Sequence, residues 1–363
     1  MPRRPEWLVL ALIVVAAALR LYVNDVVVWS RADETVYLND ARSSYPDVVR
    51  SYIADRGMWV FPSPLRWSWI GATSLCCTSY RAIATLSMIA GIAAVALTWW
   101  IARRLFDENV ALFATALAAT SPLQLALGRR ALADEFFCAL VLASIAAMLM
   151  HFETKHVGWL IAWIALTTLA LGAKEQFLLI YPVVLAFWWL RARSMSWTWI
   201  LPPVLYVAVF CLLARDVTSF FTIARLTTST IGAPYADQFQ NGPPQRFLID
   251  LIAIAPLVTL IAIIAIGSLR TPAQRHVAFL AIGIIAVHAL ISSKNVRYVV
   301  TADSPMRILA ASWLATDMRR AWILIAINAA IELAIFHQVF ITAGVYDPVT
   351  HDLLHALRML PSS

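Results

Sequence analysis

The sequence predicts an all-α polytopic membrane protein with about 10–12 transmembrane helices. Apolar residues make up 61% of its 363 positions and charged residues only 13%, and its mean hydropathy is +0.75. A water-soluble protein usually has about 45–50% apolar residues, so a soluble globular fold is excluded. No uninterrupted polar block reaches the roughly 50 residues of a separate soluble domain. We therefore expect residues 1–363 to form a single integral membrane domain.

The expected membrane spans are the apolar windows of about 20 residues. The first window follows Arg3 and Arg4 and is long for the apolar part of a cleaved signal peptide, which is the alternative there. Three short windows leave open a re-entrant pair of helices. The spans are expected at residues 7–24, 81–101, 109–127, 135–151, 157–173, 175–190, 197–214, 248–267, 276–292, 304–317 and 321–342.

The orientation follows from the basic residues, which cluster in short connections such as Arg103-Arg104 and 191–196. Positively charged loops face the cytoplasm, so the net charge of +7 is a topology signal and no nucleic-acid partner is expected. The segments assigned to the outside are 25–80, 128–134, the turn 172–175, 215–247, 293–303 and the tail 343–363.

The first outer loop, 25–80, has apolar residues near helical spacing on both sides of Pro46. Proline is tolerated in the first turn of a helix, so we expect two short amphipathic helices at 35–44 and 46–55 on the membrane surface. The Pro-broken apolar stretch 61–77 is expected to be a third surface or half-inserted helix.

Two acidic pairs lie on the outer side, Asp33-Glu34 and Asp134-Glu135. Ionised groups beside lipid are costly and persist mainly where they function. A carboxylate can take the proton of an attacking hydroxyl, and a second carboxylate nearby raises the pKa of the pair toward neutrality. The alternatives are a solvated loop for the first pair and helix capping by Asp134 for the second. The three acids Asp33, Glu34 and Asp134 also suit a divalent cation, Mg²⁺ or Mn²⁺.

The outer loops also hold cations suited to phosphate oxygens, above all Lys294 and Arg297. Snorkelling to lipid headgroups is the alternative for both. Lys174 and Glu175 are adjacent and can form a simple ion pair. The sequence has no P-loop for a nucleotide, no Ser/His/Asp arrangement and no zinc helix. Carboxylates and cations on one face therefore favour transfer of a group from a phosphate-linked lipid to a hydroxyl.

A series of short motifs follows in the order seen in a known family. The motifs are Ala32-Asp33-Glu34, Pro62-Ser63-Pro64, Tyr80-Arg81, Ala133-Asp134, Ala173-Lys174 and Arg297-Tyr298. Across residues 1–320 the chain resembles the polytopic GT-C glycosyltransferases, most closely the protein O-mannosyltransferase and lipid A aminoarabinose transferase group. Pro62-Ser63-Pro64 departs from the His-Pro-Pro of many members, which puts an acceptor or metal role at that point in doubt.

The resemblance implies inverting transfer of a sugar from a polyprenyl-phosphate donor to a protein, lipid or glycan hydroxyl. The site would face the extracytoplasmic side of a bacterial inner (plasma) membrane. Asp33 is similar to the general base, Glu34 to its supporting partner and Asp134 to the acid of the second outer loop. The donor phosphate-binding residues would be Lys294, Arg297, Tyr298, Arg81 and Lys174.

Other features leave alternatives open. Loop 215–247 is long enough to cover a donor or acceptor. In the tail 343–363, His351 and His355 can bind a metal or lie on an amphipathic helix. A lipid or solute transporter is the alternative function, although no inverted repeat is evident. A structural envelope subunit is the third, and it would not need acidic pairs on one face.

Overall fold

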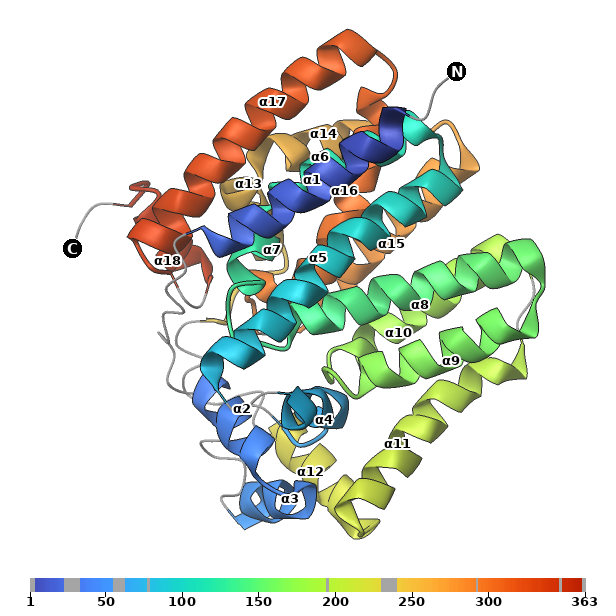
Figure 1. Ribbon diagram of the computed structural model, residues 1–363, viewed down its shortest axis with the longest axis vertical. Coiled ribbons are helices and arrows are strands. Elements are labelled where there is room, and N and C mark those ends of the chain that lie inside the picture. Colours follow the sequence, from blue (N-terminus) through green and yellow to red (C-terminus); the bar gives the residue numbers. More distant parts are fainter. Residues whose placement is uncertain are drawn as a thin grey trace.

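The computed structural model describes residues 4–22, 33–54, 63–76, 79–193, 196–229, 240–291, 293–345 and 348–360. Helices dominate these ranges, and their one isolated β-bridge joins Asn241 to Ser293. Four helical segments in them are long and apolar enough to cross a membrane: Tyr80–Leu105, Asp134–Thr154, Trp197–Ala214 and Met318–Thr342. The structure confirms the predicted all-α architecture of a polytopic membrane protein (Figure 1).

Most predicted spans correspond to one helix each. These helices are α1 (Arg4–Leu21), α5 (Tyr80–Leu105), α8 (Asp134–Thr154), α9 (Val157–Leu171), α10 (Phe177–Ala192), α11 (Leu201–Ala214), α15 (Pro272–Ala289), α16 (Val300–Leu314) and α17 (Met318–Ile335). Helix α17 continues into a π-helical segment, Phe336–Thr342.

Two predicted spans are each broken into two helices, which corrects the sequence-based boundaries. Span 109–127 consists of α6 (Glu108–Ala119) and α7 (Pro122–Leu127), and span 248–267 consists of α13 (Arg246–Ile254) and α14 (Pro256–Gly267). The second helix of each pair begins at a proline. Proline lacks the N–H that a continuing helix needs, but it fits the first position of a new one.

Short helices from the outer loops gather at the lower end of the bundle in Figure 1. They are α2 (Asp33–Arg42), α3 (Tyr45–Ala54), α4 (Trp67–Cys76) and α12 (Thr218–Ser229). The two amphipathic helices predicted on either side of Pro46 are thus present, and α4 is the third. Thr227 of α12 forms hydrogen bonds with Tyr52 of α3 (3.2 Å) and with Ser63, shortly before α4 (2.9 Å). The part of loop 215–247 that carries Tyr235, Asp237 and Gln238 lies outside the described residues.

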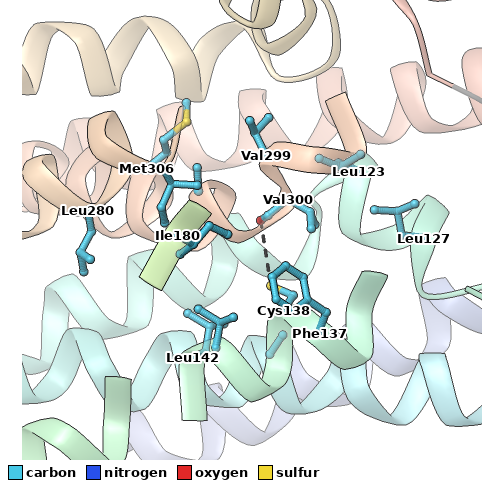
Figure 2. Packing of buried hydrophobic residues seen from close by; sticks show 14 of the residues in the cluster. Leu123, Leu127, Phe137, Cys138, Leu142, Ile180, Leu280, Val299, Val300 and Met306 are labelled. Atoms are coloured by element: carbon cyan, nitrogen blue, oxygen red, sulfur yellow. Dashed lines mark hydrogen bonds between the residues drawn. The ribbon is translucent and has the colours of Figure 1, made fainter. Parts of the chain in front are cut away.

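The apolar core lies where α7, α8, α10, α15 and α16 meet (Figure 2). Phe137 and Ile180 are fully buried there. Cys138 is also buried, with its thiol 4.0 Å from the carbonyl oxygen of Val300, and it packs as a small apolar side chain. Outward-facing leucines such as Leu212, 76% exposed, present an apolar surface to lipid.

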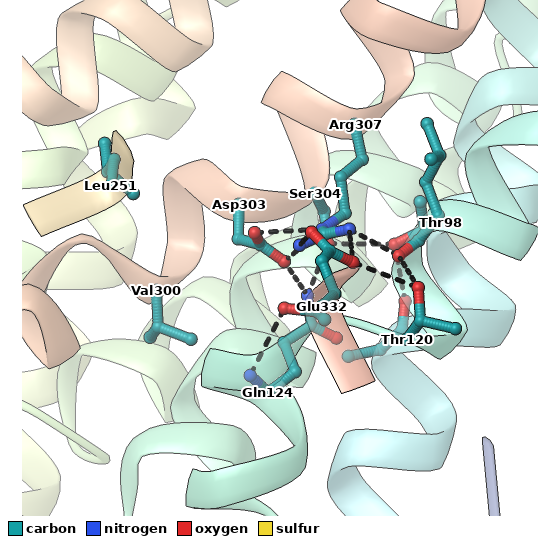
Figure 3. Close-up of polar contacts among 12 residues, drawn as sticks. Thr98, Thr120, Gln124, Leu251, Val300, Asp303, Ser304, Arg307 and Glu332 are labelled. Carbon is teal, nitrogen blue, oxygen red and sulfur yellow. Dashed lines mark hydrogen bonds and ion pairs between the residues drawn. The ribbon is translucent and has the colours of Figure 1, made fainter. Parts of the chain in front are cut away.

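A buried ionic cluster crosses this apolar interior (Figure 3). Its centre is Arg307 of α16, whose Nε donates to both carboxylate oxygens of Asp303 (2.9 Å each). The two Nη atoms donate to Glu332 of α17 at 2.8 and 3.0 Å. Gln124 of α7 donates to Asp303 (2.8 Å), and Thr120, after α6, donates to Glu332 (3.0 Å). The cluster therefore joins α6, α7, α16 and α17 at a depth where an unpaired charge would be costly.

Replacing Arg307 by methionine is expected to lower stability by about 3–5 kcal/mol, because it leaves two buried carboxylates without their cation. Thermal unfolding of the detergent-purified protein measures this loss. Arg320→Gln is the control: Arg320 pairs with Asp317 at an exposed position (3.1 Å), where a pair contributes at most about 1 kcal/mol. Equal unfolding temperatures for Arg307→Met and wild type would contradict the assignment.

Candidate active site

Asp33 and Arg297 form an ion pair at one end of the bundle, 3.2 Å apart. Asp33 begins α2, and Arg297 lies in the 3₁₀ turn Val296–Val299 that leads into α16. The side chain of Asn295 caps this turn by accepting a hydrogen bond from the backbone N–H of Arg297 (3.1 Å). The side chains of Asp33 and Arg297 are only 14% and 15% exposed. The expected base and an expected phosphate-binding cation are thus in direct contact.

A second ion pair joins Asp134, at the start of α8, to Lys174, in the turn between α9 and α10. Both side chains are 4% exposed. Burial lowers the pKa of Lys174, and the Asp134 carboxylate opposes this shift. Tyr298 connects the two pairs, because the Lys174 amine lies 5.5 Å and the Arg297 guanidinium 5.8 Å from the centre of its ring. The structure therefore brings together Asp33, Asp134, Lys174, Arg297 and Tyr298.

A third pair corrects the interpretation that Lys174 and Glu175 bind each other. Glu175 accepts two hydrogen bonds from Arg66, at 2.7 and 2.8 Å, and Arg66 also donates to the hydroxyl of Tyr37. Burial would raise the pKa of Glu175, but the Arg66 guanidinium overcomes this and holds that pKa below its usual range. The planar fork of arginine fits a carboxylate better than the single amine of lysine does.

Arg66 is the site residue that the sequence analysis missed. Its signal in the sequence is a basic residue two positions after the Pro62-Ser63-Pro64 motif, in a loop predicted to lie outside, where the positive-inside pattern predicts few basic residues. It belongs to the same site as the other pairs, since the charges of Arg66, Asp33, Asp134 and Glu175 all act on the buried Tyr37 hydroxyl.

The site as a whole is electrically balanced. Its three carboxylates, Asp33, Asp134 and Glu175, each bind one of three cations, Arg297, Lys174 and Arg66. Six charges in a mostly buried space sum to zero when all are ionised. To bind a cation of these three pairs, an anionic ligand must share it with a carboxylate or displace that carboxylate.

Glu34 is fully buried beside this site but does not join it. Burial raises its pKa to about 7, and the nearby charge of Arg130 opposes the shift. The backbone N–H of Ala131 also opposes it. Its expected role as the partner of Asp33 stays a prediction.

The structure places two further predicted cations away from the three pairs. Lys294 is 1% exposed; its amine lies 5.8 Å from the centre of the Phe247 ring, and burial lowers its pKa. Arg81 is an exposed residue in the first turn of α5. In the tail, His351 and His355 stack on α18 (Thr350–Ala356) with ring centres 6.3 Å apart.

The three predicted metal ligands, Asp33, Glu34 and Asp134, are not arranged as a metal site. Within the described ranges, no group of three or more His, Cys, Asp or Glu side chains is placed to hold a metal ion. Asp33 and Asp134 are each bound to a cation, and Glu34 is buried near Arg130. These residues therefore do not fit a Mg²⁺ or Mn²⁺ site as arranged here, and the expected dependence on such an ion stays a prediction.

Comparison with known proteins gives a family match over part of the chain. Residues 63–217 match the family model for dolichyl-phosphate-mannose-protein mannosyltransferases. Among curated proteins, no relative matches the sequence. The segment that this model covers, less than half of the 363 residues, thus resembles a GT-C glycosyltransferase domain. The domain match includes Arg66, Asp134, Lys174 and Glu175, whereas Asp33 and Arg297 lie on either side of it.

Two solved structures show the same fold over nearly all of this chain. ArnT from Cupriavidus metallidurans, bound to undecaprenyl phosphate, has a TM-score of 0.61 and 19% identity over 94% of this chain and 66% of its own. The archaeal oligosaccharyltransferase AglB from Archaeoglobus fulgidus, in complex with an inhibitory peptide and a dolichol-phosphate, has a TM-score of 0.59 and 12% identity. That match covers 99% of this chain and 54% of AglB. This chain thus spans less than two thirds of the length of either protein.

The turn that carries Lys174 and Glu175 docks tightly onto α4. The carbonyl of Gly172 accepts the backbone N–H of Ser68 (2.8 Å), and a Cβ at Gly172 would overlap the Trp67 ring. Gly172→Ala is therefore expected to displace the turn and lower stability by about 1–3 kcal/mol, measured by thermal unfolding. Gly71→Ala is the control, because a Cβ there meets no atom within 4 Å. A loss equal to that of Gly71→Ala would show that the packing is not tight.

The raised pKa of Glu34 predicts a pH-dependent stability. The folded protein holds the proton up to about pH 7, whereas the unfolded chain releases it near the ordinary 4.5. Stability therefore falls as the pH rises through this window, by on the order of 2 kcal/mol from Glu34. Partly buried Asp40, whose pKa is raised to about 7 by burial, contributes a change in the same direction.

Thermal unfolding at pH 5 and pH 8 tests this effect. Glu34→Gln, which cannot ionise, is expected to lose less stability between the two pH values than wild type. Glu108→Gln, at a half-exposed position on α6, is expected to keep the wild-type slope. Identical slopes for all three proteins would rule out Glu34 as the titrating group.

Proposed function

We propose that this chain transfers a sugar from a polyprenyl-phosphate-linked donor to a hydroxyl acceptor, with inversion at the anomeric carbon. The observation that supports this proposal most is the ion pair between Asp33 and Arg297, a carboxylate and a guanidinium side by side in a chain whose fold is that of GT-C proteins. The ArnT structure holds undecaprenyl phosphate and the AglB structure holds a dolichol-phosphate. A lipid phosphate is therefore the ligand class that this fold accommodates in both proteins.

Asp33 is assigned as the general base. Its carboxylate takes the proton of the acceptor hydroxyl while that oxygen attacks the anomeric carbon. The bond between the anomeric carbon and the phosphate oxygen breaks, and the phosphate keeps the electron pair. One displacement from the face opposite the leaving group inverts the configuration.

The cations stabilise the phosphate as it leaves. Arg297 and Lys174 share the Tyr298 ring and are assigned the main part, because preplaced donors act where negative charge develops. Lys294 lies over Phe247 and is assigned a longer-range electrostatic part. Arg66 is already bound by both oxygens of Glu175, so it is assigned to hold the turn in which Glu175 and Lys174 lie.

The protein is an integral membrane protein, as its apolar helices and its fold indicate. The positive-inside pattern supports placing the site on the extracytoplasmic face, with a bacterial inner membrane as the proposed location. The polyprenyl tail would then lie among membrane lipids, and the acceptor, whether protein, lipid or glycan, would approach from the aqueous side.

The test is transfer of radiolabelled sugar from a panel of polyprenyl-phosphate sugars to a membrane extract by the purified protein. Asp33→Asn is expected to reduce transfer by about 10²–10⁴-fold, the usual contribution of a general base. Asp47→Asn is the control, since Asp47 pairs with Arg50 on the exposed surface of α3. Donor consumption by neither protein would contradict the function, and equal turnover by wild type and Asp33→Asn would contradict the base.

A further inference from the structure

We infer that Arg297 exchanges partners, holding Asp33 until the phosphate of the donor draws its guanidinium away. Donor binding would then free the base, so that the donor binds before the acceptor reacts. This inference rests on the proposed function and extends it to the order of events in the site.

The Asp33–Arg297 pair is the weakest of the three pairs in the site. It has a single contact at 3.2 Å. Arg66 binds Glu175 through two shorter bonds, at 2.7 and 2.8 Å. Charge-assisted hydrogen bonds are strongest at about 2.7–2.9 Å and when two run in parallel. An incoming phosphate therefore displaces the Asp33 carboxylate from Arg297 more readily than it displaces Glu175 from Arg66.

The second pair is protected by burial. The side chains of Asp134 and Lys174 are 4% exposed, against 14% and 15% for Asp33 and Arg297. A buried carboxylate that loses its cation is costly, whereas Asp33 can exchange the guanidinium for the hydroxyl of the acceptor. The exchange is thus confined to the pair that includes the base.

The net charge of the three ion pairs also favours the move of Arg297 from Asp33 to the phosphate during the reaction. The three pairs sum to zero before the donor binds, so each cation within them is already bound to a carboxylate when the phosphate arrives. When Asp33 takes the acceptor proton it loses its negative charge, and the leaving phosphate gains one. The total charge of the site is unchanged by the transfer, and Arg297 is needed at the phosphate at the moment when Asp33 no longer needs it.

Tyr298 provides a surface along which the guanidinium can move. Its ring lies 5.8 Å from the Arg297 guanidinium and 5.5 Å from the Lys174 amine, and its hydroxyl forms a 3.2 Å hydrogen bond with Gln240. A cation within about 6 Å of an aromatic ring is attracted to its face. Arg297 can therefore turn from Asp33 toward Lys174 without leaving the ring, which would bring two cations to one phosphate.

The inference predicts that removing the charge of Asp33 strengthens lipid-phosphate binding. Farnesyl phosphate is the probe, titrated at pH 8 into the detergent-purified full chain, with binding followed by calorimetry. Asp33→Asn is expected to bind it roughly 10-fold more tightly than wild type, because Arg297 no longer has to leave the Asp33 carboxylate. Glu34→Gln is the matched control: it removes a charge from the next position of the same helix, and the cation that acts on Glu34 is Arg130.

The same titration is made with Arg297→Gln and with the double variant Asp33→Asn/Arg297→Gln. With Arg297 absent, the gain from Asp33→Asn is expected to disappear. Equal affinities for Asp33→Asn and wild type would overturn the exchange while leaving the proposed function intact. Equal gains in affinity for Asp33→Asn and Glu34→Gln would also overturn the exchange, because the effect would then be that of removing any nearby negative charge. Binding by none of the proteins would contradict the proposed function, and the inference with it.

A second measurement needs no variant and so does not depend on the folding of Asp33→Asn. Carbodiimide labelling of the wild-type protein, read by mass spectrometry, reports which carboxylates are accessible. Farnesyl phosphate is expected to raise labelling of Asp33 several-fold and to leave the exposed Asp47 unchanged. Protection of Asp33 on addition of the probe would show that Arg297 stays in place.

Discussion

The paired burial of Arg307 is the constraint on which the rest of this structure depends. Its guanidinium is 0% exposed and binds Asp303 and Glu332 inside an otherwise apolar bundle. A cation at this depth is tolerated only with its partners in place, so α16 and α17 have one register relative to α6 and α7. Because α16 directly follows the turn Val296–Val299, fixing α16 also fixes where Arg297 and Tyr298 meet the outer loops.

Much of the fold could be predicted from the sequence because its signals are local. Apolar windows located the spans, and the residues around Pro46 located α2 and α3. The broken spans were missed because residues on both sides of Pro122 and of Pro256 are apolar, so hydropathy does not register the interruption. A proline in a long apolar window can kink a helix or start a new one, and packing by distant helices decides between the two.

Most residues of the site could be predicted from the sequence, but the ion pairs between them could not. Asp33 and Arg297 are 264 positions apart, and Arg66 and Glu175 are 109 apart, so their contacts follow from helix packing and not from spacing. Adjacent Lys174 and Glu175 suggested a pair, yet each binds a residue from another element. The matched domain supplies four of the six paired charges, and the segments on either side of it supply Asp33 and Arg297.

Polar residues at the break between α6 and α7 find their partners only late in the synthesis of the chain. Gln124 and Asp303 are 179 positions apart, and Thr120 and Glu332 are 212 apart. During synthesis the first partners enter the bilayer long before the second ones exist, and their polar groups must stay hydrated or shielded until then. Insertion of Arg307 alone would cost roughly 2.5–3.5 kcal/mol, but Asp303 lies one turn away and enters with it. The polar contacts of α6 and α7 are therefore completed only when the last helices, α16 and α17, have been inserted.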